Sequence, residues 1–270
     1  MQFSLKVRRQ TPPPFVGRVV RLGYIAKGLI YSLVGILALR VGLGMRGGRI
    51  TDPSGVLASL LRQPFGRIML AAIGIGIIGY SAYYVFEAIA DTRRRGGGVR
   101  GWSARGLTII KAAAYGTIGV QALRLTFLDD RPRDGTERGA RLLLQIPLGN
   151  WLLAAIGIGI AIYGITQLRM VWRGGADDDI DVGRVRREAA WLLPLGRFGT
   201  GARSVILVVM GLTVAWSGLF KHAAFADGYR EVLATIAGVN PWALAAMGGG
   251  LLSFGLYQLA HARYVKLSVS

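Results

Sequence analysis

Long apolar stretches alternate with short segments rich in arginine and glycine along almost the whole chain. Six of these stretches have about 20 residues, the length that a helix needs to cross roughly 30 Å of hydrocarbon. We therefore expect an all-α integral membrane protein with six transmembrane helices. The predicted spans cover residues 22–43, 68–89, 106–128, 151–171, 204–220 and 242–262.

The composition supports this fold class and excludes much chemistry. Of 270 residues, 52% are hydrophobic and only 17% are charged, and the mean hydropathy of +0.43 is too high for an ordinary soluble domain. With no cysteine and two histidines, the chain offers few metal ligands and few nucleophiles. We expect no cofactor, no metal site, no catalytic residue and no enzyme activity.

The charge distribution predicts the orientation. A formal charge of +19 would suggest nucleic acid in a soluble chain, but here the cations lie between apolar runs, so we expect no nucleic-acid partner. The segments on one side of the predicted membrane hold 18 Lys and Arg, against ten on the other. Because cationic loops stay in the cytoplasm, both termini are expected there. Residues 1–14 are basic without a cleavage site, so the first span resembles an uncleaved signal anchor.

The sequence repeats itself three times. The pattern R-x5-[KR]-x7-G begins at Arg21, Arg105 and Arg197 with identical spacing. A glycine-rich motif follows in each copy, reading AAIGIGI at 71–77 and 154–160 and AAMGGGL at 245–251. We expect three tandem helical hairpins that close around a pseudo-threefold axis.

The repeats also predict the organisation of the chain. Between the two spans of each repeat, an acidic residue and a later proline enclose a short helical pattern, whose leucines are expected to face the outer leaflet. The predicted units are a cytoplasmic basic tail (1–21), repeat 1 (22–91), a cytoplasmic basic loop (92–105), repeat 2 (106–173), a cytoplasmic juxtamembrane segment (174–196), repeat 3 (197–265) and a cytoplasmic tail (266–270).

Two motifs carry a resemblance to a known family. They are R-x-G-Y-x-A-[KR]-G, which runs from Arg21 to Gly28, and the P-F-G turn from Pro64 to Gly66 before a glycine-rich span. The chain resembles, over nearly its whole length, the bacterial membrane family called domain of unknown function 1206. The resemblance implies a six-span protein of the bacterial inner membrane, and it brings no catalytic or binding residues.

The glycines of the even-numbered spans have two interpretations. Gly74, Gly76 and Gly79 spell G-x-G-x-x-G, but a dinucleotide site needs a preceding strand and an aqueous phosphate site, which this context does not offer. Small residues let helices approach closely in lipid, so packing is favoured over a glycine-lined cavity. The predicted packing glycines are Gly74, Gly76, Gly157, Gly159, Gly248 and Gly250.

Three equivalent cations are candidates for an anion or lipid-headgroup site. Lys27, Lys111 and Arg203 are predicted about one turn inside the cytoplasmic end of their spans, where threefold closure would place them in a ring. A cation one turn from the end of a span can also extend its head to the lipid phosphates. This snorkelling interpretation predicts splayed heads and is favoured.

Two further candidate groups have competing interpretations. Glu87 and His261, with Arg169 in the corresponding region of the second copy, could serve a proton-linked role, although an interhelical ion pair or interfacial anchoring is favoured. The spacing of acidic residues in the juxtamembrane segment resembles a calcium loop, but neighbouring arginines favour an acidic helix start instead. These acidic residues are Asp177, Asp179, Asp181 and Glu188.

Two functional hypotheses follow. The favoured one is a structural or accessory subunit, or a lipid-interacting scaffold, of a membrane assembly. Its expected partners are membrane lipids with anionic headgroups, and it allows a membrane-protein partner or a homo-oligomer. The alternative is a small-solute or ion pathway along the pseudo-threefold axis, which usually requires ionisable residues near the middle of the membrane.

Overall fold

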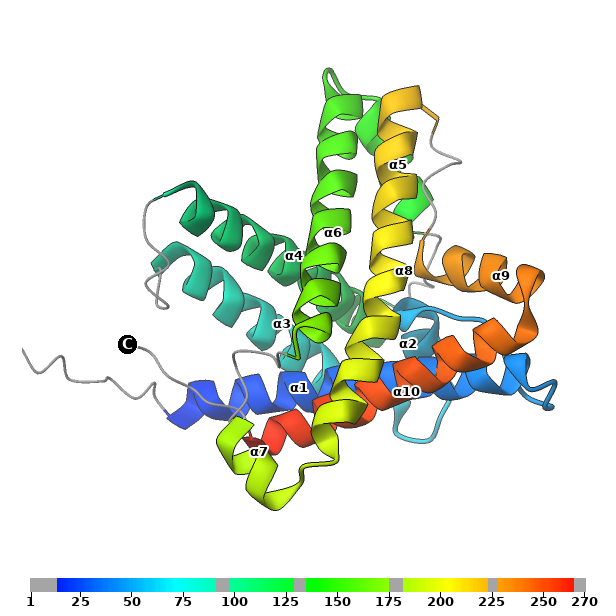
Figure 1. Cartoon of the computed structure of the whole chain (residues 1–270). Helices are drawn as coiled ribbons and strands as arrows, with labels where there is room; N and C mark the ends of the chain where they lie inside the picture. Colours follow the sequence, from blue (N-terminus) through cyan, green and yellow to red (C-terminus); the bar gives the residue numbers. More distant parts are fainter. Residues whose placement is uncertain (1–13, 91–97, 129–134, 175–181, 223–227, 265–270) are drawn as a thin grey trace, which may run out of the picture.

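The computed structural model describes residues 14–90, 98–128, 135–174, 182–222 and 228–264, and within these ranges the regular structure is entirely helical (Figure 1). Six helices are long and four are short. The long helices are α1 (Pro14–Gly42), α3 (Gly66–Ala90), α4 (Val99–Phe127), α6 (Gly149–Trp172), α8 (Leu192–Phe220) and α10 (Pro241–Tyr264). The short helices are α2 (Pro53–Leu61), α5 (Gly135–Leu144), α7 (Val182–Glu188) and α9 (Tyr229–Val239).

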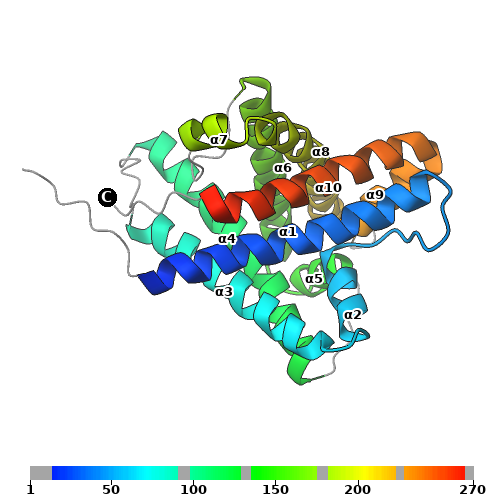
Figure 2. The same ribbon diagram turned by 90° about the horizontal axis from the view of Figure 1, so that it is seen from below.

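The six long helices form three antiparallel pairs, α1 with α10, α3 with α4 and α6 with α8. The pairs point in different directions and cross near the middle of the molecule, and Figure 2 shows α1 alongside α10 with the α6–α8 pair behind them. Contacts between pairs join α1 to α3 and α8 to α10, whereas α4 and α6 touch only lightly. The long helices therefore follow one another in a closed cycle.

Five of these helices are long and apolar enough to cross a membrane: α3, α6, α8, α10 and the part of α1 from Val20 to Gly42. The predicted span 106–128 lies within α4, which is not among the five. Cationic side chains lower its hydropathy, because α4 carries Arg105, Lys111 and Arg124. By length alone α4 matches α1 and α8, since all three have 29 residues.

The helices that hold the odd-numbered predicted spans begin before those spans, although the apolar part of α1, Val20–Gly42, starts close to the predicted residue 22. The helices begin at Pro14, Val99 and Leu192, whereas the predicted starts were residues 22, 106 and 204. Hydropathy excluded the polar first turns, but a helix needs only its backbone hydrogen bonds to continue through them. The predicted cations consequently lie near the middle of their helices.

Glycine faces glycine within each helix pair. A Cβ added to Gly35 would lie 2.7 Å from the carbonyl oxygen of Gly248. The corresponding distances are 3.3 Å from Gly119 to Gly74 and 2.8 Å from Gly211 to Gly157. The separations at Gly35 and Gly211 are too short for a methyl group and the one at Gly119 is tight, so the backbones of the paired helices come into close contact at these positions.

The second glycine of each G-x-G motif faces a different neighbour. Residues two apart on a helix point about 200° apart, so the two glycines serve opposite sides. A Cβ on Gly76 would lie 3.1 Å from the carbonyl carbon of Leu22 in α1, and one on Gly250 would lie 2.3 Å from Cβ of Ala202 in α8. On Gly159 it would lie 2.7 Å from the Ile110 side chain, where α6 approaches α4.

The short helices pack against the long ones. The acidic residue expected before α2, Asp52, caps that helix by accepting a hydrogen bond of 2.8 Å from the Gly55 amide. The expectation that the α2 leucines face the outer leaflet is wrong for Leu57 and Leu60, which are buried together with Val56. Helix α2 contacts α1, α3 and α4, and these neighbours cover its apolar face.

Tight turns lead into α3 and α6 with the same geometry. Phe65 and Leu148 both have φ of 60°, in the left-handed region. The following glycines have no room for a side chain, since a Cβ would lie 2.1 Å from Leu60 O at Gly66 and 1.6 Å from Leu143 O at Gly149. The P-F-G pattern thus reverses the chain sharply between a short helix and a long one.

The glycine contacts predict a difference between two positions of α8. Gly211→Ala should lower the unfolding free energy by about 1 to 3 kcal/mol, because its Cβ would lie 2.4 Å from the Ala161 amide nitrogen. Gly201→Ala is the control, since its nearest atom is Val171 Cγ1 at 4.0 Å and alanine favours a helix. Thermal unfolding in detergent measures both variants, and equal midpoints would contradict the contact.

Candidate functional site

The three equivalent cations converge where the helix pairs cross. Lys27 is 6% exposed and Arg203 is 4% exposed, while Lys111 is half-buried. Side chains enclosed by protein cannot reach separate lipid phosphates on the outside of the bundle. The snorkelling interpretation of Lys27 and Arg203 is therefore wrong, because both cations lie at mid-helix and point inward.

Each cation lies against several aromatic rings. Lys27 Nζ is 4.8 Å from the centroid of the Tyr115 ring and 5.0 Å from that of Phe254, with the Tyr80 and Tyr24 rings at 5.7 and 6.0 Å. An ammonium or guanidinium group over an aromatic face gains about 0.5 to 2 kcal/mol. Several rings are needed to offset the roughly 2.5 to 3.5 kcal/mol that a cation costs at the centre of a membrane helix.

Shared rings join the three cations into one cluster. The Tyr80 ring lies 5.7 Å from Lys27 Nζ and 5.6 Å from Lys111 Nζ. The Phe254 ring lies 5.0 Å from Lys27 Nζ and 5.2 Å from Arg203 Cζ. We name this cluster the cation–aromatic centre, and it comprises Lys27, Lys111 and Arg203 with Tyr24, Tyr31, Tyr80, Tyr84, Tyr115 and Phe254.

One side of the centre, its lysine half, includes the predicted acid and histidine. The Lys111 ammonium lies 3.8 Å from the Tyr84 ring, and buried Glu87 follows one turn later on α3. His261 is fully buried and stacks on Tyr24 with ring centroids 4.2 Å apart. A hydrogen bond of 2.9 Å joins the hydroxyls of Tyr24 and Tyr84, which ties α1 to α3.

The structure separates Arg169 from this group. Counting from the shared glycine motif, the position that corresponds to Glu87 and His261 is Met170, one residue further along α6. Arg169 is exposed, so it cannot pair with them inside the bundle. The second repeat therefore brings no ionisable side chain of α6 to this level.

Other members of the site were missed from the sequence. Tyr31 and Tyr115 stand four residues after Lys27 and Lys111, on the same face of their helices, and this spacing is a signal that could have found them. Gln258 is fully buried one turn beyond Phe254 on α10. Tyr229 comes from the short helix α9, and its ring packs on that of Tyr31 with centroids 6.2 Å apart. No sequence pattern indicates that contact.

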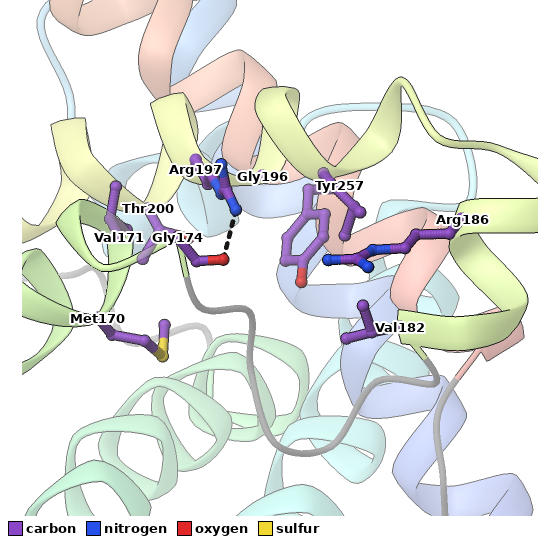
Figure 3. Close-up of a pocket in the computed structure, with 10 residues that line it drawn as sticks. Met170, Val171, Gly174, Val182, Arg186, Gly196, Arg197, Thr200 and Tyr257 are labelled. Atoms are coloured by element: carbon purple, nitrogen blue, oxygen red, sulfur yellow. Dashed lines mark hydrogen bonds between the residues drawn. The ribbon is translucent and has the colours of Figure 1, made fainter.

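A small pocket lies near the N-terminal end of α8, apart from the cation–aromatic centre. It has a volume of about 40 Å³ and lies among α6, α7, α8 and α10. Figure 3 shows Arg186 pointing toward Tyr257 and Arg197 donating a hydrogen bond to the carbonyl oxygen of Gly174. Both arginines are exposed, so this hollow opens at the surface.

The calcium hypothesis is not supported by the acid that the structure describes. Glu188 accepts a hydrogen bond of 2.7 Å from Arg184, one turn earlier in α7, and this contact lowers the pKa of the Glu188 carboxyl. Asp177, Asp179 and Asp181 lie outside the described residues. Within the described ranges, no three acidic or histidine side chains are grouped as metal ligands.

Apolar helices of membrane-spanning length, arranged around buried charges, define a multi-pass membrane protein as the class of this chain. The model of the family described as Domain of Unknown Function (DUF1206) matches residues 22–91 and 108–174. A relative from Bacillus subtilis (strain 168), "Uncharacterized protein YxxB", is 30% identical over 266 residues, which cover 97% of this chain and 96% of the relative. The chain belongs to the DUF1206 family. No solved structure matches it.

Two substitutions of one tyrosine separate the roles of its ring and its hydroxyl. Tyr84→Phe keeps the face over Lys111 and loses the hydrogen bond to Tyr24, so stability should fall by about 0.5 to 1.5 kcal/mol. Tyr84→Leu also removes the face and leaves a cavity, and should cost about 2 kcal/mol or more. Unfolding midpoints in detergent rank the variants, with exposed Phe86→Leu as control. Equal effects of the two Tyr84 variants would exclude the ring contact.

Proposed function

We propose that the chain spans the bacterial inner membrane six times, as three two-span repeats closed around a pseudo-threefold axis. Two observations support a sixth span. Helix α4 is as long as α1 and α8, and it pairs with α3 in the same way that α1 pairs with α10 and α8 pairs with α6. The family model matches two successive segments that coincide with the first two predicted repeats. The same glycine-to-glycine contact, in each of the three helix pairs, supports the symmetry.

The tryptophans support the placement of the long helices across a membrane. Tryptophan concentrates at both membrane–water interfaces. All six tryptophans are more than half exposed, and each lies in or beside the first or last turns of a long helix. They are Trp102, Trp151, Trp172, Trp191, Trp216 and Trp242.

Cysteine labelling distinguishes six spans from five. The chain has no native cysteine, so single cysteines at Ser54, Gly135 and Ser268 report three positions. Six spans predict that an impermeant thiol reagent labels Ser54→Cys and Gly135→Cys in intact cells, whereas Ser268→Cys reacts only after permeabilisation. If α4 does not cross, Gly135→Cys is protected in intact cells and Ser268→Cys is labelled.

We infer that the function is a small-solute or ion pathway through the crossing of the helix pairs. The observation that carries this proposal is the convergence of buried Lys27 and Arg203 and half-buried Lys111 on shared aromatic rings. Apolar packing alone would hold a scaffold together, and buried ionisable groups in membrane helices commonly mark substrate or ion paths. The scaffold hypothesis was favoured because Lys27, Lys111 and Arg203 were predicted at the ends of their spans. Their positions near the middle of α1, α4 and α8 remove that argument.

The least packed junction between helix pairs suggests where such a pathway opens. Within each helix pair, backbones touch at glycines, and two of the three junctions between pairs are well packed. The third junction, between α4 and α6, is light, and one of its contacts is the Ile110 side chain against Gly159. We propose that α4, which carries Lys111, moves relative to α6 when a solute passes, and that no chemical step is involved.

Reconstitution tests the pathway. Purified protein in liposomes should dissipate imposed gradients of potassium chloride or potassium nitrate faster than protein-free liposomes, as measured by ion-selective fluorescence. Lys111→Met should reduce the rate at least about tenfold, because it removes one charge from the centre. Arg67→Met, which removes an exposed cation at the start of α3, should leave the rate unchanged. Rates equal to those of empty liposomes would favour the scaffold or accessory role.

A further inference from the structure

Arg203 is buried and forms no ion pair with a carboxylate of the described residues. Its side chain makes one hydrogen bond to the described residues, from Nε to the hydroxyl of Tyr31 at 3.4 Å. The rings of Tyr31, Tyr115 and Phe254 lie 5.2 to 5.9 Å from Cζ. Rings can cover the face of the guanidinium, but they offer little to the N–H groups that lie in its plane.

The surrounding helices supply no counter-ion. Helices α1, α4, α8 and α10 contain no aspartate or glutamate at all. The carboxylate of Glu231 on α9 is already bound to Arg230 at 2.9 Å and to the Gly228 amide at 3.1 Å. The buried acid Glu87 lies on α3, which is not one of these helices. Since arginine stays protonated, its charge cannot be relieved by loss of a proton.

Unused donors lie beside this arginine. The hydroxyls of Tyr115 and Tyr229 are buried and have no hydrogen-bond partner among the described residues. The Tyr115 ring lies 5.9 Å from Arg203 Cζ, and the Tyr229 ring packs on Tyr31, whose hydroxyl accepts the Arg203 hydrogen bond. A buried polar group that lacks a partner costs about 1 to 3 kcal/mol, so such groups usually mark a site that something else fills.

We propose that the arginine half of the centre, formed by Arg203, Tyr31, Tyr115 and Tyr229, binds a small monovalent anion. The guanidinium supplies the charge and a fork of N–H donors, and the tyrosine hydroxyls donate from the sides. This assignment rests on the proposed function, because it names the class of ion that occupies the pathway. Because Arg203 is buried at 4% exposure, we take the small anions chloride, nitrate and formate as the ligands to test.

Anion-dependent stability of the full-length protein tests this site. In detergent at constant ionic strength, gluconate, which is too large for the site, is replaced stepwise by chloride, nitrate or formate. The unfolding midpoint should rise and then saturate, because a ligand that binds only the folded state stabilises it. Calorimetric titration with nitrate should give heat for one site per chain.

Three variants assign the effect to Arg203. Arg203→Met should unfold in gluconate at or above the wild-type midpoint, since it removes an uncompensated buried charge, and should not respond to anions. Arg203→Lys keeps the charge but loses the fork, and should weaken nitrate binding at least about tenfold. Arg67→Met, which removes an exposed cation at the start of α3, is the control and should keep both the wild-type midpoint and the anion-dependent rise.

The outcomes are distinct. A wild-type midpoint that does not respond to any of the three anions, with no titration heat, would overturn the proposal. So would a response that survives in Arg203→Met, or one produced only by adding anionic lipid at constant salt, which would indicate a headgroup site. Binding without flux in liposomes would leave the anion site standing and reject the pathway. Flux without binding would reject the anion site alone.

Discussion

The enclosure of three cations inside a largely apolar bundle is the constraint on which the rest of the structure depends. No single aromatic ring offsets the transfer of a charge from water, so each cation needs several rings from different helices. Those rings reach Lys27 from α1, α3, α4 and α10 only because the helix pairs cross at this point. The crossing in turn separates the outer ends of the pairs, which leaves room for α2, α5 and α9 beside them.

The glycines make this crossing possible. Without side chains at Gly35 and Gly248, the α1 and α10 backbones come close enough for rings on neighbouring turns to meet at the centre. A G-x-G motif serves two partners at once, because its glycines face opposite sides of one helix. Gly74 contacts α4 and Gly76 contacts α1, so helix α3 is fixed on both sides by one short motif. The tightest packing therefore joins each even-numbered span to the odd-numbered span of the next repeat.

Periodicity in the sequence predicted which residues are equivalent but not how deep they lie. Lys27, Lys111 and Arg203 were found as one set from spacing alone, and hydropathy then placed them at span ends because it scores the polar first turns as loop. Helices continue through such turns, and α8 begins at Leu192 on a sequence that also contains Pro194 and Arg197. Contacts such as Tyr229 on Tyr31 depend on tertiary placement of a short helix, and no local pattern encodes them.

The differences between the repeats give the three cations of the cation–aromatic centre unequal surroundings. At the position of Glu87 on α3, helix α6 carries Met170 and helix α10 carries His261. Among the described residues, only the first repeat therefore brings a carboxylate of these three helices into the interior. Where Tyr31 and Tyr115 stand, the third repeat has Leu207, and its cation is an arginine. A strict threefold copy would give each cation the same surroundings. Divergence at these few positions instead places a buried acid, Glu87, on α3, and leaves Arg203 among helices without aspartate or glutamate, which is where we propose that an anion binds.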